Sequence, residues 1–266
     1  MSRTFEKYEG LGNDFLVLDA RVWPESELTP TLAKVLCDRH TGVGGDGLLW
    51  VDRSGPASLR MVILNADGSR PEMCGNGVRC VAAAAAMREG LTTGAVIEVM
   101  SDAGPRPAVL RSVIDGGWQV EVDMGVASVS PVSLEVPSEK GFQRVVAVDV
   151  GNPHGVLFGA AGDDLALVRA VTGLAAFPRG VNVELVTAEG DGFRVRVHER
   201  GVGWTQACGT GACAVAAAAV REGLAAAGRA LRVTLDGGDL SIVVEPGSWR
   251  VRMTGPARRV FAGTLG

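Results

Sequence analysis

Two cysteines open two similar stretches of this chain. Residues 74–91 read CGNGVRCVAAAAAMREGL, and residues 208–224 read CGTGACAVAAAAVREGL. In each stretch, a cysteine precedes a Gly-x-Gly turn, an alanine-rich run and the tetrapeptide Arg-Glu-Gly-Leu. A helix that begins after such a turn leaves backbone N–H groups unpaired beside the thiol, at the positive end of the helix dipole. This setting favours the thiolate, so Cys74 and Cys208 are candidate bases.

The same helix ends could also bind an anion. Unpaired N–H groups hold carboxylates, and the glycines allow a ligand to approach the backbone closely. Two such ends could bind one α-carboxylate from both sides, with a thiol on each face of the α-carbon. One thiolate would remove the α-proton while the other thiol protonates the opposite face, which is stereoinversion by two bases. No lysine motif for PLP is visible, so burial and the helix dipoles would stabilise the developing charge.

Other interpretations of the cysteines stay open on these residues alone. Both could be small buried residues in tight turns, or two facing thiols could form a redox pair, although no redox exchange motif accompanies them. The odd total of five argues against a disulfide framework, and we interpret Cys37, Cys80 and Cys213 as core thiols. The three histidines are not spaced with cysteines as zinc ligands, so we predict no metal site.

Composition narrows the class of protein. The 266 residues are 47% hydrophobic and 21% charged, which allows a substantial core, and the net charge of −4 gives no footprint for nucleic acid or an anionic membrane. The first residues contain no apolar signal-peptide core, and the alanine runs are too short to span a bilayer. We therefore expect a soluble cytoplasmic protein that binds neither nucleic acid nor membranes.

The elements that must position the cysteines are mostly strands. Twelve short apolar runs with turn residues between them predict a β-rich chain, and helices are expected at about 29–40, 76–89, 163–172 and 210–222. Gly90 and Gly223 should end the two cysteine helices. Both halves run from strands through the cysteine helix to further strands. We predict an α/β (α+β) fold of two pseudo-symmetric domains, each a curved mixed or antiparallel sheet barrel around a central helix. The expected domains are residues 1–115 with 256–266, and residues 116–255.

Several motifs, taken in order, resemble those of the diaminopimelate epimerase family. They are GLGNDF (10–15), HTGVGGDGLL (40–49), NADGS (65–69), MCGNGVRC (73–80), GNPH (151–154), VNVE (181–184), ERGVGWTQACGTGAC (199–213) and GPARRVFAG (255–263). The resemblance implies an epimerase without PLP or metal that interconverts LL- and meso-2,6-diaminopimelate on the route to lysine and peptidoglycan. It assigns Cys74 as proton donor and Cys208 as acceptor, roles that exchange when the reaction reverses.

The same resemblance implies roles for further residues. The position of His154 and that of Glu199 matter for catalysis in the family. Gly75, Asn76, Gly209 and Thr210 would hold the reacting carboxylate through backbone N–H groups. Asn13, Asn65, Asn152, Asn182, Glu199 and Arg200 would bind the rest of the substrate, with the Arg200 fork suited to the distal carboxylate. From the residues alone, most of these asparagines fit ordinary turns, but Asn182 lies in an apolar strand and needs a partner.

Three positions depart from the family pattern. Trp204 stands where many members have Glu, Gly47 where some have a substrate-contacting Gln, and Phe261 where some have a tyrosine linked to dimerisation. We still expect a homodimer, with Phe261 as a candidate contact. The alternatives to diaminopimelate epimerase are an epimerase of proline-like substrates and a thiol redox or amino-acid-binding protein.

Overall fold

The structure is a computed structural model that describes residues 3–55, 58–139 and 141–266. Its contacts divide the chain into two compact units, Met1–Val122 with Thr254–Gly266, and Asp123–Met253. The chain passes from one unit to the other inside two strands, β7 (Gly117–Val126) and β17 (Arg250–Leu265). Each unit is a curved mixed sheet with one central helix, which confirms the predicted fold class. The domain boundaries proposed from the sequence stay a prediction.

The strands of the first unit close into a ring. With β7 and β17, its members are β1 (Arg3–Gly10), β2 (Asn13–Asp19), β3 (Gly47–Gly55), β4 (Ser58–Asn65), β5 (Val96–Ser101) and β6 (Gly104–Ile114). β1 pairs with β2 on one side and with β17 on the other, and β17 also pairs with β7. The pairs β2–β3 and β4–β5 are parallel, whereas β3–β4, β5–β6 and β6–β7 are antiparallel. The result is a mixed barrel.

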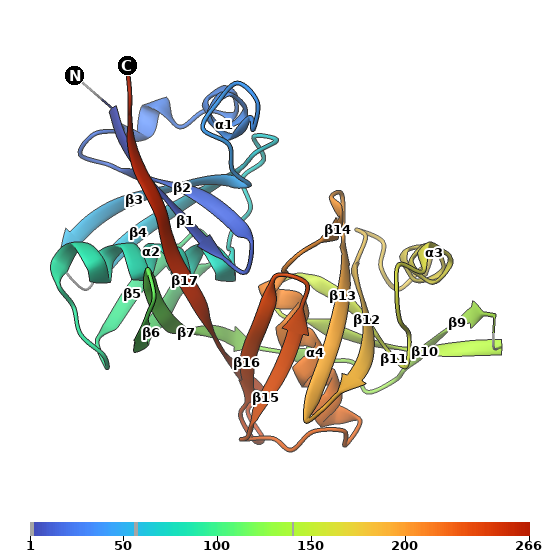
Figure 1. Ribbon diagram of the computed structural model, residues 1–266. Helices are drawn as coiled ribbons and strands as arrows, with labels where there is room; N and C mark the ends of the chain where they lie inside the picture. The colour runs from blue at the N-terminus through green and yellow to red at the C-terminus, as the bar shows by residue number, and fades with distance from the viewer. Residues whose placement is uncertain (1–2, 56–57, 140) are drawn as a thin grey trace. The chain divides into compact units, whose positions relative to one another are not determined.

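Helix α2 (Gly75–Glu89) packs against the strands of this ring. It contacts β1 through β6, and Figure 1 shows it among these strands. The alanines at 82–86 are at most 2% exposed. Such small side chains let the sheet curve closely around the helix. Gly90 ends the helix with a φ of 65°, a left-handed conformation that glycine adopts without strain, as predicted.

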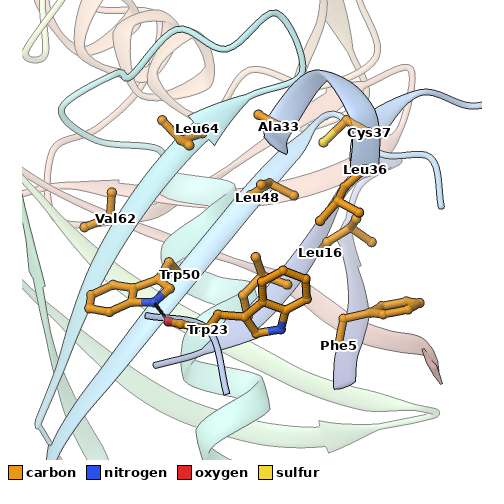
Figure 2. Packing of buried hydrophobic residues seen from close by; sticks show 11 residues of the cluster. Phe5, Leu16, Trp23, Ala33, Leu36, Cys37, Leu48, Trp50, Val62 and Leu64 are labelled. Carbon is orange, nitrogen blue, oxygen red and sulfur yellow. Dashed lines mark hydrogen bonds between the residues drawn. The ribbon is translucent and has the colours of Figure 1, made fainter. Parts of the chain in front are cut away.

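A second core covers the other face of this sheet. Helix α1 (Pro30–Cys37) begins at Thr29, whose side chain accepts a hydrogen bond from the Leu32 amide. Its buried side chains Ala33, Leu36 and Cys37 pack on apolar residues of β2, β3 and β4 (Figure 2). The Trp50 indole donates to the carbonyl of Trp23 at 2.7 Å, which satisfies a buried N–H group.

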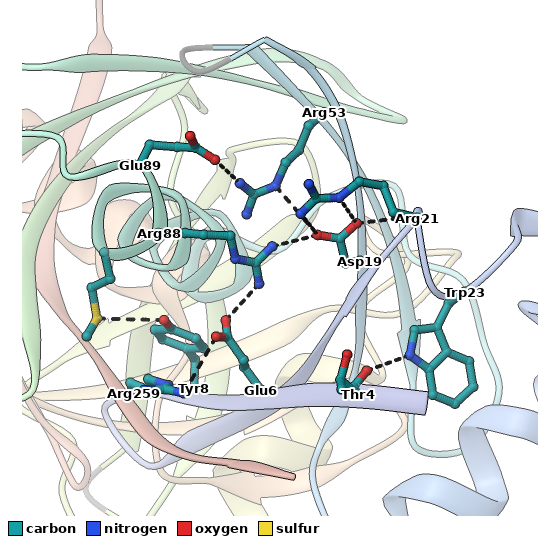
Figure 3. A network of polar contacts seen from close by, with 11 residues as sticks. Thr4, Glu6, Tyr8, Asp19, Arg21, Trp23, Arg53, Arg88, Glu89 and Arg259 are labelled. Carbon is teal, nitrogen blue, oxygen red and sulfur yellow. Dashed lines mark hydrogen bonds and ion pairs between the residues drawn. The ribbon is translucent and has the colours of Figure 1, made fainter. Parts of the chain in front are cut away.

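Ion pairs fix the end of α2 that lies away from Cys74. Arg88 donates to Asp19 at 2.6 Å and to Glu6 at 2.9 Å, and Glu89 pairs with Arg53 (Figure 3). A cation in the last turn also complements the helix dipole. The helix that carries Cys74 at its start is therefore held to the sheet at its other end.

The second unit follows the same plan. Its strands are β8 (Ser128–Val129), β9 (Leu134–Ser138), β10 (Gly141–Asp149), β11 (Pro153–Phe158), β12 (Asn182–Glu189), β13 (Gly192–Glu199), β14 (Gly203–Thr205), β15 (Ala230–Leu235) and β16 (Gly238–Val244). The pairs β11–β12 and β13–β15 are parallel. Helix α4 (Gly209–Arg221) contacts β8, β10, β11, β12, β15 and β16, and its alanines are buried. Helix α3 (Leu165–Thr172) covers a separate apolar cluster.

Some predicted elements differ from the structure. The helix expected at 29–40 ends at Cys37, because Asp38 is extended and its side chain accepts from the amides of His40 and Thr41. Strands β1, β6, β9 and the last part of β17 were not predicted, since charged residues or prolines interrupt their apolar pattern, and the short strands β8 and β14 were also missed. Among the described residues, none of the helices combines the length and apolar character needed to cross a bilayer.

Candidate active site in two half-sites

Both cysteines occupy the position just before a helix. Cys74 precedes α2 with φ −142° and ψ 113°, and Cys208 precedes α4 with φ −128° and ψ 108°. Each sulfur accepts a hydrogen bond of 3.4 Å from the amide three residues later, at Gly77 and Gly211. This is the geometry of a helix cap, in which a side chain satisfies one unpaired N–H group. The two half-sites thus share one backbone arrangement, in separate units of the chain.

Acidic side chains surround Cys208. Burial first, and then the carboxylates of Glu199 and Glu184, raise the pKa of the Cys208 thiol well above its ordinary value. The Thr210 hydroxyl, 3.4 Å from the sulfur, and the Gly211 amide act in the opposite direction but are outweighed. The resulting rise in the pKa of Cys208 is opposite to the direction expected from the helix dipole alone. Desolvation and two nearby negative charges exceed the effect of the helix dipole.

Glu199 lies within hydrogen-bonding reach of this thiol. Burial raises the pKa of the Glu199 carboxyl, while hydrogen bonds from Thr205 and Cys208 oppose that shift. The Thr205 hydroxyl donates to Glu199 at 2.6 Å. The Glu199 carboxyl therefore has a fixed orientation and a raised pKa beside the Cys208 sulfur.

His154 is completely buried in the same half-site. Its Nδ1 lies 2.6 Å from Glu184 Oε1, and its Nε2 lies 3.0 Å from Asn152 Oδ1. The histidine therefore links Asn152, a predicted substrate ligand, to a carboxylate that the sequence reasoning did not assign to the site. A charged residue within the apolar strand VNVELV was the signal that could have identified Glu184.

Asn182 and Arg200 lie together in this unit. Asn182 faces His154 across the β11–β12 pair, and its Oδ1 accepts from the Arg200 amide at 2.9 Å. The buried amide thus has the partner that an apolar strand requires. The Arg200 side chain is largely exposed and donates to the carbonyl of Arg179 at 2.6 Å.

Amides and one aspartate surround the start of α2 in the first unit. Asn76 donates to Asn13 Oδ1 at 3.1 Å, and Asn13 donates to Asp46 Oδ2 at 2.8 Å. Asp46 also accepts from Arg39 at 2.9 Å, so its charge is already compensated. Asn76 is 3% exposed, and within the described residues its Oδ1 has no hydrogen-bond partner. That oxygen is available to accept from a ligand.

Asn65 and Gly47 occupy neighbouring positions of the β3–β4 pair. Asn65 donates to Ser69 at 2.9 Å, so this side chain serves the local turn, as its sequence context allowed. A Cβ atom at Gly47 would lie 2.6 Å from the carbonyl oxygen of Leu64. The backbone as it stands therefore leaves no room there for the glutamine side chain of some relatives.

The other departures from the family pattern pack locally. Trp204 makes an edge contact with His198 at 5.1 Å between ring centroids, and the Arg196 guanidinium lies 4.9 Å from its ring. Phe261 packs edge-on against Phe5 at 6.0 Å and is 43% exposed.

The three remaining cysteines differ from the pair at the helix starts. Cys37, Cys80 and Cys213 are buried among core residues. Burial raises the pKa of Cys37 to about 12 and also raises that of Cys80. Across the described ranges, no three or more His, Cys, Asp or Glu side chains gather in a way that could hold a metal ion.

Solved structures with the same fold support the architecture. A hydroxyproline epimerase from Agrobacterium vitis, solved with trans-4-hydroxy-L-proline, aligns with a TM-score of 0.73 at 16% identity, over 99% of this chain and 92% of that one. A phenazine biosynthesis protein from Bacillus anthracis aligns with a TM-score of 0.74 at 15% identity, over 100% and 99%. At such identities the likeness concerns the fold alone.

Sequence relatives carry the assignment further. A diaminopimelate epimerase from Thermosynechococcus vestitus is 43% identical over 289 residues, covering 100% of both chains. Another, from Desulforudis audaxviator, is 44% identical over 278 residues, covering 97% of this chain and 98% of its own. The family model for diaminopimelate epimerase matches residues 5–130 and 146–260. The chain therefore belongs to the diaminopimelate epimerase family, whose members are isomerases.

Proposed function

We propose that this chain interconverts LL- and meso-2,6-diaminopimelate, with Cys74 and Cys208 as the acid–base pair. The observation that carries the proposal is the repeated cap geometry, in which each cysteine sulfur accepts a hydrogen bond from the amide three residues later. This geometry occurs in a chain that matches the diaminopimelate epimerase family. Two equivalent thiols suit a reaction whose forward and reverse directions are the same chemistry on opposite faces of one carbon.

The helix starts would bind the reacting carboxylate. Backbone N–H groups at Gly75–Asn76 and at Gly209–Thr210 would donate to its two oxygens, and the helix dipoles would favour its charge. As the α-proton leaves, negative charge moves onto this carboxylate. Donors already oriented toward it stabilise that charge without reorganisation.

The two thiols need opposite protonation states when catalysis begins. Burial and the carboxylates of Glu199 and Glu184 raise the pKa of Cys208, which favours Cys208 as the proton donor in one direction. Cys74 then removes the α-proton from the other face. In the reverse direction the roles exchange, and Cys74 is then the proton donor and Cys208 the acceptor, as the family labels have it.

Side chains outside the repeat would select the substrate. Asn13, Asn65, Asn152, Asn182, Glu199 and Arg200 are the proposed ligands of the distal amino acid group and of the reacting ammonium. Arg200 is exposed and could form two parallel hydrogen bonds to a carboxylate. A site built to bind charged groups rejects substrates that lack them, because its polar groups would lose their partners.

Solvent isotope exchange tests this function. Reduced protein is incubated with LL-diaminopimelate in deuterium oxide without added PLP, and both α-deuterium incorporation and formation of the meso isomer are measured. We expect both to occur. A parallel incubation with L-proline and trans-4-hydroxy-L-proline should give neither. Exchange with the proline substrates alone would reassign the activity, and binding of diaminopimelate without exchange would reject an epimerase.

Oxidation offers a second test of the same proposal. A disulfide between Cys74 and Cys208 would remove both acid–base groups, so oxidised protein should be inactive and recover on reduction. We further propose that the protein works in the cytoplasm, on the route to lysine and peptidoglycan precursors, as a homodimer in which Phe261 contributes to the contact. Sedimentation of the protein and of a Phe261→Ser variant checks the dimer.

A further inference from the structure

Glu184 is a fully buried carboxylate that the proposed reaction has not yet used. Its side chain has no exposed surface, and Oε1 lies 2.6 Å from Nδ1 of His154. Within the described residues, its other oxygen, Oε2, is buried and has no hydrogen-bond partner. A carboxylate in such a setting is costly to bury, so its retention in an apolar strand requires a reason.

Strand register explains how Glu184 reaches the half-site. In the parallel pair β11–β12, His154 lies opposite Asn182 and Val156 lies opposite Glu184. Residues two apart on a strand point to the same face, so Asn182 and Glu184 both face the same layer. Helix α4, which starts after Cys208, contacts β11 and β12.

A glycine in the cysteine repeat makes room for this carboxylate. A Cβ atom at Gly211 would lie 2.8 Å from Glu184 Oε1 and 3.3 Å from the Cys208 sulfur. The second glycine of Cys-Gly-Thr-Gly therefore allows both groups to approach the start of the helix. The equivalent position in the first unit, Gly77, faces the apolar Leu49 side chain instead.

Two consequences follow from this position. First, the carboxylate fixes the ring of His154, whose other nitrogen lies 3.0 Å from Asn152 Oδ1. With that amide oxygen engaged, the amide nitrogen of Asn152 is left to donate to a substrate. Second, Glu184 adds a negative charge close to both Cys208 and Glu199. The titratable groups that face it are thus His154 on β11, Glu199 at the end of β13 and Cys208 before α4.

We propose that Glu184 is a positioning residue of the Cys208 half-site: it orients His154 and through it Asn152, and it places a carboxylate charge beside the start of α4, where Cys208 lies. The inference deepens the proposed function and rests on it for the roles of Cys208 and Asn152. It adds a residue whose effect on turnover passes through other side chains, since its carboxylate is enclosed by them.

Alkylation of Cys208 tests the charge effect without any substrate. The rate of iodoacetamide labelling of the Cys208 peptide is followed by mass spectrometry as a function of pH, for wild type, Glu184→Gln and Glu184→Asp. Removal of the charge in Glu184→Gln should move the labelling midpoint down by about one pH unit. Glu184→Asp keeps the charge and should leave the midpoint near that of wild type.

A matched control separates this effect from the general result of neutralising a buried carboxylate. Glu121 on β7 is 9% exposed and pairs with Arg111 at 2.6 Å, in the other unit. Glu121→Gln should not move the Cys208 midpoint. If Glu184→Gln moves it no further than Glu121→Gln does, the charge effect is rejected. Thermal unfolding establishes that each variant is folded.

Kinetics test the positioning effect. Glu184→Gln removes the carboxylate from the 2.6 Å contact to His154, and Glu184→Asp withdraws it by one methylene group, so each should lower kcat/KM for diaminopimelate by about tenfold to a hundredfold. Unchanged kcat/KM in Glu184→Asp would reject the positioning role, including where Glu184→Gln fails to fold. Failure of wild type to epimerise diaminopimelate would reject the proposed function instead, while the labelling midpoints would still decide the charge effect.

Discussion

Cys74 and Cys208 begin helices of the same kind, but the side chains around them differ in charge. Near Cys74, the polar groups at the start of α2 are the amides of Asn76 and Asn13, and the nearby Asp46 is compensated by Arg39. Cys208 lies near Glu199, Glu184 and the buried His154. The carboxylates of Glu199 and Glu184 contribute to the raised pKa of the Cys208 thiol. The same helix-cap geometry therefore occurs in two different electrostatic environments. At Cys208, burial and the two flanking carboxylates outweigh the helix dipole and raise the pKa of the thiol.

Removal of either sulfur should have the largest effect. Cys74→Ala and Cys208→Ala should each lower the rate of epimerisation by about 10³-fold, because each removes one acid–base group. Each variant should also retain α-deuterium exchange for at most one of the two isomers, and the two variants should differ in which isomer exchanges. Chiral chromatography with mass spectrometry measures both effects. Cys37→Ala is the control, and an equal loss there would make the thiols structural.

Neutralisation of Glu199 should have the next largest effect. Glu199→Gln should lower kcat/KM by about 10²-fold, because the carboxyl next to Cys208 can no longer exchange or attract a proton.

The stability of the Glu199→Gln variant should depend on pH with a defined sign. Burial raises the pKa of Glu199 in the folded state. Wild type therefore loses folding free energy as the pH rises from the ordinary glutamate pKa to the higher folded-state pKa, because Glu199 ionises more readily in the unfolded chain. The variant lacks that loss. Its Tm relative to wild type should therefore be higher near neutral pH than in acid, as measured by thermal unfolding between about pH 4 and 8. A pH-independent difference would contradict the raised pKa.

Matched glycine substitutions would compare the two helix starts directly. Gly211→Ala places a Cβ atom 2.8 Å from Glu184 Oε1, so we expect about a tenfold loss of kcat/KM as the carboxylate and sulfur are displaced. Gly77→Ala meets the end of the Leu49 side chain at 2.9 Å, which can move, so the main expected cost is about 1 kcal/mol of stability. Steady-state kinetics and thermal unfolding of both variants distinguish these outcomes. Equal kinetic losses would show that Glu184 does not distinguish the half-sites.

The smallest effect should come from restoring the usual family residue at position 204. Trp204 packs against His198 and Arg196. Trp204→Glu should therefore change kcat/KM by no more than about twofold, while the lost aromatic contact should cost about 1 kcal/mol of stability. A large change in KM for diaminopimelate would instead place this position in the substrate site.

The elements around the cysteines were predictable because they depend on local interactions. The start of each helix follows from a side-chain cap and a glycine within four residues, and the end of α2 from the left-handed Gly90. Strands β1 and β6 were missed because their charged and proline residues hide the alternation of buried positions. Those strands are stabilised by pairing with distant partners, which no local pattern encodes.

The candidate site also contains residues that the motifs predicted and one that they did not. Motif order placed Asn13, Asn76, His154 and Glu199 near the cysteines, and the structure brings Asn13 to Asn76, and places His154 and Glu199 around Cys208, within their own units. The turn-like context of Asn65 agrees with its bond to Ser69, whereas the sequence reasoning did not predict that Glu184 would lie against His154.

The sequence by itself determined that two thiols would each begin an alanine-rich helix, since capping and small-residue packing act over a few residues along the chain. Only the tertiary structure decided what surrounds each thiol. The proton affinity of Cys208 depends on burial and on Glu184 and Glu199, which come from β12 and β13 and reach the sulfur only when those strands pair and pack on α4. Electrostatic energy depends on distance in space and on desolvation, neither of which can be read from spacing along the chain.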